Sequence, residues 1–217
     1  MVKKPAAKKK STKAKPGPHG DPRNAIIDAA LTLAGQLGWA EVRLDDIADS
    51  AGLSMADMYR VLPSKTAIVA AYMQRVDEAV GQGGLAERDE PVKDRLFEII
   101  MRRFDALQAD RDGVAGIVRA TMTDPAALLC LFGLRNRSLK WMLELAALGS
   151  DGFKGRMRAR GLELIMLSTT RVWLKDDSQD MSVTMAHLDR QLGRANQFVA
   201  TVLNWGRRGP DAASDTA

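Results

Sequence analysis

Residues 44–65 constrain the fold of this chain most, because they hold two short helical patterns separated by a single glycine. Leu44 and Ile47 lie on one apolar helical face, and Gly52 is expected to end that helix. A second helix can begin at Ser54, whose hydroxyl can cap the free N–H groups. Two short helices joined by so tight a turn predict a helix-turn-helix, a motif whose second helix can face a DNA groove.

The second of these helices has a predicted inward and a predicted outward face. Met58 and Leu62 should face the core, while Asp57 should close a capping box with Ser54. The residues expected to face outward are Met55, Ala56, Tyr59 and Arg60. Of these, only Arg60 is a type that commonly forms two hydrogen bonds to one base.

Residues 23–72 resemble the DNA-binding domain of the TetR family of transcriptional regulators. The residues that carry the resemblance occur in the family's order: Leu37-Gly38-Trp39, Asp46-Ile47-Ala48, Ala51-Gly52-Leu53-Ser54, Tyr59 and Pro63-Ser64-Lys65. The resemblance implies an all-α fold, in which an N-terminal three-helix helix-turn-helix domain precedes a larger helical domain for ligand binding and dimerisation. It also implies a ligand-responsive repressor that binds double-stranded DNA in a sequence-specific way.

Seven residues are implied as DNA contacts by this resemblance: Arg43, Ser54, Met55, Asp57, Tyr59, Arg60 and Lys65. Tyr59 and Lys65 are expected on phosphates, and Arg60 is expected on a base edge. The chain departs from the family where the family usually has Gly, Thr and Phe, at Ala56, Asp57 and Leu62. An Asp beside a phosphate is repulsive unless it is turned inward as a cap.

Charge is distributed unevenly along the chain. Residues 21–65 carry four basic and seven acidic side chains, which is unfavourable for a module that binds a polyanion. The net charge of +5 comes from residues 1–20, which hold seven Lys and no acid. This segment is predicted to be disordered, either as an arm that attracts DNA non-specifically or as a solubilising leader. A second disordered tail is predicted for residues 208–217.

Several functions are disfavoured by composition. Cys130 is the only cysteine, and His19 and His187 are the only histidines, so we expect no disulfide, metal site, cofactor or enzymatic activity. Cys130 itself is predicted to be a small core residue. Residues 1–20 lack the apolar segment of a secretory signal, and no later stretch has the length of a membrane span, so we expect a cytoplasmic protein.

Helical spacing predicts the remaining organisation. Residues 21–65 form the helix-turn-helix domain, 66–84 a linking helix and a glycine-rich break, and 85–207 the effector-binding and dimerisation domain. We expect a small apolar effector in a cavity between helices, lined from among Phe97, Phe104, Phe132, Trp141 and Met166. Each of these residues could instead be an ordinary core residue.

The last two predicted helices, 153–174 and 181–205, should pair with the same two helices of a second subunit, as they do in the TetR family. The residues expected at this homodimer interface are Leu164, Leu167, Leu188, Leu192, Val199 and Val202. Apolar residues in the final helix recur at alternating spacings of three and four, which is typical of a seam for another helix. The alternative is a helix pair buried wholly within one subunit.

A second, weaker resemblance covers residues 169–192. Its elements are Trp173-Leu174, Asp177-Ser178, Asp180, Thr184 and Leu188-Asp189-Arg190. They are similar to the C-terminal part of the TetR-fold lipid-binding proteins of ubiquinone biosynthesis, which do not bind DNA. The alternative function is therefore a lipid or isoprenoid carrier, although such a chain has less physical reason to keep Tyr59 and Lys65.

Overall fold

The computed structural model describes residues 21–207, with side chains to residue 197, and within that range every regular element is an α-helix. The helices are α1 (Pro22–Leu37), α2 (Leu44–Ser50), α3 (Met55–Val61), α4 (Lys65–Gln82), α5 (Val92–Gln108), α6 (Arg111–Thr123), α7 (Pro125–Leu145), α8 (Gly152–Trp173) and α9 (Ser182–Arg207). The predicted all-α fold is confirmed. Both predicted tails, 1–20 and 208–217, lie outside the described residues.

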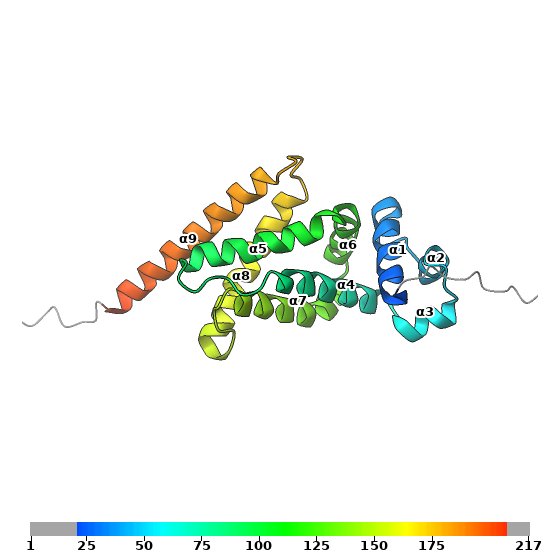
Figure 1. The fold of residues 1–217 in the computed structure, drawn as a ribbon, viewed down its shortest axis with the longest axis horizontal. Coiled ribbons are helices and arrows are strands. Elements are labelled where there is room, and N and C mark those ends of the chain that lie inside the picture. Colours follow the sequence, from blue (N-terminus) through cyan, green and yellow to red (C-terminus); the bar gives the residue numbers. More distant parts are fainter. Residues whose placement is uncertain (1–20, 208–217) are drawn as a thin grey trace, which may run out of the picture.

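Helices α1 to α3 lie together at one end of the molecule and form what we call the head (Figure 1). Pro22 opens α1, where its missing N–H costs nothing, and Asp21 Oδ1 accepts a hydrogen bond from Arg23 N at 3.0 Å. Gly52 has a φ of +69° in the turn between α2 and α3, a conformation that favours glycine. The three helices close over fully buried side chains: Ile26, Ile27, Ile47, Ala48 and Met58. The predicted inward face of the second short helix is confirmed.

Helices α4 to α9 form the body, and their buried side chains belong to the same hydrophobic core as those of the head. Trp173 and Phe104 are fully buried, with ring centroids 5.6 Å apart, and Trp173 Nε1 donates to Gln108 Oε1 at 2.7 Å. Helix α5 packs against α4, α7 and α9, while α8 and α9 meet at the turn that joins them and diverge from it (Figure 1). In the described part of the chain, no helix combines the length and the hydropathy that a bilayer crossing requires.

The head docks on the body where α1 crosses α6, through two glycines one helical turn apart. A Cβ atom placed on Gly113 would lie 2.5 Å from Leu31 O, and one on Gly116 would lie 2.3 Å from Ala34 O. Both distances are shorter than any real Cβ contact with backbone. The two helix backbones therefore approach each other closely, and only glycine fits at these two positions of α6.

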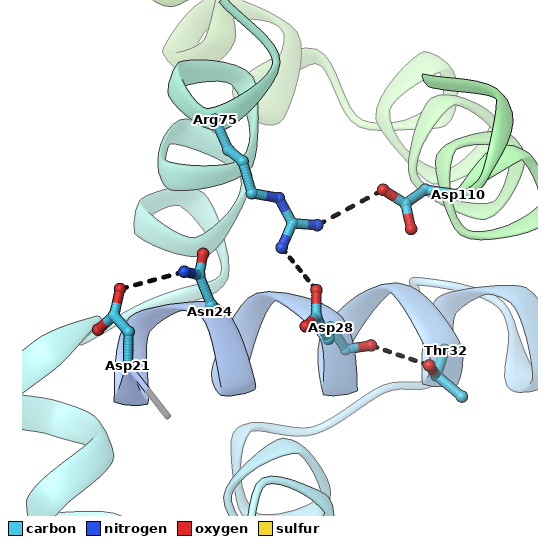
Figure 2. A network of polar contacts seen from close by, with 6 residues as sticks. All are labelled: Asp21, Asn24, Asp28, Thr32, Arg75 and Asp110. Atoms are coloured by element: carbon cyan, nitrogen blue, oxygen red, sulfur yellow. Dashed lines mark hydrogen bonds and ion pairs between the residues drawn. The ribbon is translucent and has the colours of Figure 1, made fainter. Parts of the chain in front are cut away.

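A charged contact joins the head to α4 beside this crossing. Figure 2 shows Arg75 of α4 between two carboxylates, with Nη1 2.6 Å from Asp28 Oδ1 of α1 and Nη2 3.4 Å from Asp110 Oδ2 just before α6. The same guanidinium stacks over the Tyr72 ring, 5.4 Å from its centroid. Arg75 thus links α4 both to the head and to the segment that leads into the docking helix.

Three predictions about buried residues are corrected by the structure. Cys130 is exposed on α7 and is not a core residue. Leu188 and Leu192 of α9 are 0% and 3% exposed within the single chain, so they cannot serve as residues of a dimer interface. The physical reason is that α5 and α8 already cover this seam of α9. The side chains of Val199 and Val202 lie outside the described ones.

The turn between α8 and α9 is organised by one buried carboxylate. Asp176 accepts hydrogen bonds from Thr184 N (2.8 Å) and Oγ1 (2.6 Å), and from Ser178 N (3.0 Å) and Oγ (2.5 Å). Burial raises the pKa of Asp176, but the four hydrogen bonds outweigh it and lower the pKa to about 2. The Ser178 and Thr184 of the second resemblance therefore have a structural role in this turn.

We expect Asp176→Asn to lower the free energy of unfolding by about 1.5–3 kcal/mol at pH 7, because it removes charge-assisted hydrogen bonds. Since the folded pKa is depressed, this stabilisation is present above the unfolded pKa of 3.8 and is lost as the pH falls through about 2. Urea unfolding at pH 7 and pH 3 should therefore show a smaller difference from the unmodified protein at pH 3. The control is Asp180→Asn, at an exposed carboxylate that accepts one bond, from Ser182 N. An equal loss at both positions would contradict this account.

Candidate nucleic-acid interface

Helix α3 presents an exposed face whose position is fixed by its buried face. Met58 and Leu62 are buried in the head, and this orientation turns the predicted outward residues to the surface: Met55, Ala56, Tyr59 and Arg60. Tyr59 is 69% exposed, an unusual position for an aromatic ring in a single chain. The face combines a ring, a thioether and a guanidinium, which are groups that can contact phosphates and base edges.

Hydrogen bonds and one ion pair connect Ser54, Asp57 and Arg60 along α3. Ser54 Oγ accepts from Asp57 N at 3.1 Å and donates to Asp57 Oδ2 at 2.6 Å, while Asp57 Oδ1 pairs with Arg60 Nη2 at 3.0 Å. The predicted capping box is corrected here, because the Asp57 carboxylate takes the Ser54 hydroxyl instead of the backbone N–H. The pairing with Arg60 was not predicted from the sequence, although a spacing of three in a helix was a sufficient signal.

Helix α2 carries a similar pair. Arg43 Nε lies 3.0 Å from Asp45 Oδ1, and the Arg43 backbone N–H donates to Asp46 Oδ2 at 3.1 Å. The hydrogen bond between the side chains raises the pKa of Arg43 and lowers the pKa of Asp45. Arg43 at the N-cap of α2 and Arg60 of α3 are therefore each paired with a carboxylate of the same helix.

Lys65 has a different setting from the one the family resemblance implies. Its Nζ donates to the backbone oxygens of Trp39 and, at 2.8 Å, of Val42, and lies 4.6 Å from the Trp39 ring centroid. Burial lowers the pKa of Lys65, and the charge of Glu41 opposes that shift. Lys65 thus ties the start of α4 to the loop between α1 and α2. An ammonium group has three donors, so at most one remains for the predicted phosphate contact.

The five residues predicted for an effector cavity are spread over different environments. Phe104 is buried against Trp173, Phe97 and Met166 are partly buried, and Phe132 and Trp141 are exposed. None of the five lines the pocket of about 200 Å³ between α1, α4 and α7 or the pocket of about 260 Å³ between α1 and α4. Ligand sites typically enclose about 300–1,000 Å³. The apolar effector site stays a prediction.

Comparison with known proteins agrees with this geometry. Residues 26–72 match the model of the family described as bacterial regulatory proteins, tetR family. The HTH-type transcriptional activator FasR of Mycolicibacterium smegmatis is 27% identical over 165 residues, which cover 74% of this chain and 75% of that protein.

Solved structures show the same fold. A TetR transcriptional regulator from Nitrosomonas europaea matches with a TM-score of 0.68 and 25% identity, over 82% of this chain and 99% of that one. A TetR transcriptional regulator from Rhodococcus sp. RHA1 matches in fold with a TM-score of 0.58 and 21% identity, over 79% and 94% of the two chains. The family model, the relative FasR and the structure from Nitrosomonas europaea favour a regulator over the lipid carrier.

Proposed function

We propose that this chain, which belongs to the TetR family of transcriptional regulators, binds double-stranded DNA as a homodimer by placing α3 of each subunit in the major groove. The observation that carries the proposal is the exposed face of α3, with Tyr59 and Arg60 turned outward by the buried Met58. Residues 21–65 would read DNA, 66–84 would link, and 85–207 would bind an effector and dimerise. The proposal is supported by the helix-turn-helix arrangement of α2 and α3 and by the hydrogen-bonding groups of Tyr59 and Arg60.

The dimer surface that we propose lies on α8. Four apolar side chains of this helix are exposed and are spaced so that they share one face: Phe153, Met157, Leu164 and Leu167. Their spacing corresponds to an alternation of three and four residues once Arg160 is included, which is the pattern of a seam between two helices. A second copy related by a two-fold axis would cover the same face on each subunit.

Whether the protein represses or activates transcription is a separate prediction. The relative FasR is named an activator, whereas our sequence-based prediction is a repressor that a small apolar ligand releases. Deletion of the gene should raise transcripts of adjacent genes if the protein represses and lower them if it activates. Either change, confined to genes whose upstream DNA binds the purified protein, supports the regulator.

The proposal is tested by fluorescence polarisation of the purified full chain with DNA from upstream of its own gene, in moderate salt. We expect specific retention against a scrambled duplex of the same composition. Tyr59→Phe removes only the exposed hydroxyl and should weaken binding about 2- to 10-fold for every sequence, the equivalent of one hydrogen bond. Because the residue is exposed, its thermal unfolding should be unchanged. Failure of the unmodified protein to prefer any natural duplex would contradict the proposal.

A further inference from the structure

We infer that Arg60 reads a guanine in each operator half-site and that Asp57 is the positioning residue that orients it. The inference rests on the proposed function, because it names the base chemistry that the α3 face selects. Asp57 is one of the positions at which the sequence departs from the TetR resemblance, so the resemblance does not supply this role.

The Asp57 carboxylate is held at both oxygens by different partners. Oδ2 accepts a hydrogen bond from the Ser54 hydroxyl at 2.6 Å, and Oδ1 forms an ion pair with Arg60 Nη2 at 3.0 Å. Ser54 is itself fixed, because it is the N-cap of α3 and its Oγ accepts from Asp57 N at 3.1 Å. The Arg60 guanidinium is therefore tied through one turn of helix to the start of the helix.

The remaining donors of Arg60 suit one base. A guanidinium carries five N–H donors, and the ion pair with Asp57 is made at Nη2, away from the donors on Nε and Nη1. Guanine presents two acceptors, N7 and O6, in the major groove, whereas adenine presents one acceptor and one donor there. A fork of parallel N–H groups can satisfy both acceptors of guanine and is mismatched to adenine. An arginine that is already oriented loses less side-chain freedom when it forms this contact.

The ion pair between Asp57 and Arg60 is not explained by a contribution to folding stability. Both side chains are substantially exposed, and an exposed ion pair contributes little to the stability of the fold. If Asp57 contributed only its charge, it would repel phosphates and weaken binding to all DNA alike. Orientation of Arg60 and simple repulsion therefore predict different results when the charge is removed.

The chain contains a matched control for the charge. Arg43 and Asp45 form a pair at the same 3.0 Å distance, and both of their side chains are exposed. This pair lies on α2, which in a helix-turn-helix crosses the backbone instead of entering the groove. Asp45→Asn thus removes the same charge from the same domain without touching the helix that reads bases.

The experiment is selection from a pool of randomised DNA duplexes by the full chain, followed by affinity measurements on the enriched sequence and its single-base variants. The unmodified protein should enrich a guanine in each half-site, whose change to adenine costs roughly 5- to 150-fold in affinity. Arg60→Ala and Arg60→Lys should both lose that discrimination. Asp57→Asn should reduce the discrimination between guanine and adenine at the same base pair. Asp45→Asn should raise the affinity for every duplex and leave that discrimination unchanged.

Two results would overturn the inference while leaving the proposed function intact. One is an Asp57→Asn protein with full discrimination at the base pair that Arg60→Ala relaxes, since Asp57 would then not orient Arg60. The other is a selected motif with no position sensitive to Arg60. If the unmodified protein selects no motif at all, the proposed function itself fails and the inference fails with it. Circular dichroism of each variant should show unchanged folding, because the substituted side chains are not buried.

Discussion

Replacing Gly116 by alanine should push the head away from the body and destabilise the protein by about 1–3 kcal/mol. The added Cβ would lie 2.3 Å from Ala34 O, and a backbone oxygen of a helix cannot rotate out of the way as a side chain can. Alanine favours a helix over glycine by about 1 kcal/mol, so the clash must exceed that gain. Denaturant unfolding should show a lower midpoint, and DNA affinity should fall because α1 carries the reading helix with it.

The same substitution at other helical glycines gives the opposite expectation. A Cβ on Gly133 of α7 would have no atom within 4 Å, so Gly133→Ala should stabilise the protein by up to about 1 kcal/mol. Gly113→Ala should resemble Gly116→Ala, because its Cβ would lie 2.5 Å from Leu31 O. If Gly113→Ala and Gly116→Ala raise the midpoint as Gly133→Ala does, the close packing of α1 on α6 is wrong.

The head could be predicted from the sequence because its determinants are local. Asp21 and Pro22 at one helix start, Gly52 in the turn and Ser54 at the next start each act on neighbouring backbone within a few residues. The inward position of Met58 follows from the helical period alone. The predicted inward and outward faces of α3 are therefore confirmed, whereas the contacts of the Asp57 carboxylate differ from the prediction.

Contacts between distant helices were harder to predict. The alternating spacing in α9 correctly indicated a packing seam, yet spacing does not say which helix covers it, and α5 and α8 cover Leu188 and Leu192. Lys65 is another case, since its partners Trp39 and Val42 lie in a loop more than twenty residues away. The two glycines of α6, one turn apart, are a pattern that allows another helix to approach closely, and α1 does so at this place.

Exposure in the single chain also separates dimer residues from core residues, which sequence patterns do not. Leu164 is 70% exposed and Leu167 is also exposed, so both members of the predicted interface on α8 are available to a partner. Leu188 and Leu192 are not. A test of the dimer should therefore substitute α8, because a charge at Leu188 would unfold the chain whatever its oligomeric state.

We expect Leu164→Glu combined with Leu167→Glu to convert a dimer into folded monomers. Burying one leucine contributes about 1.5–3 kcal/mol, and a symmetric interface contains each leucine twice. Exposed substitutions away from special features usually change folding stability by less than about 0.5 kcal/mol, so the subunit should stay folded. Sedimentation equilibrium at micromolar concentration measures the change, and thermal unfolding by circular dichroism checks the fold.

DNA binding should fail together with the dimer, because the two half-sites of an operator need two linked heads. Loss of the link removes an avidity gain of roughly 10²- to 10⁴-fold, while the α3 face of each monomer stays intact. Leu85→Glu is the matched control, since Leu85 is an exposed leucine in the loop after α4 whose exposure, 60%, lies between those of Leu164 and Leu167, and that protein should stay dimeric and bind DNA. An unmodified protein that sediments as a monomer would refute the proposed interface. If the double variant stays dimeric, the dimer interface lies on a surface of the body other than α8.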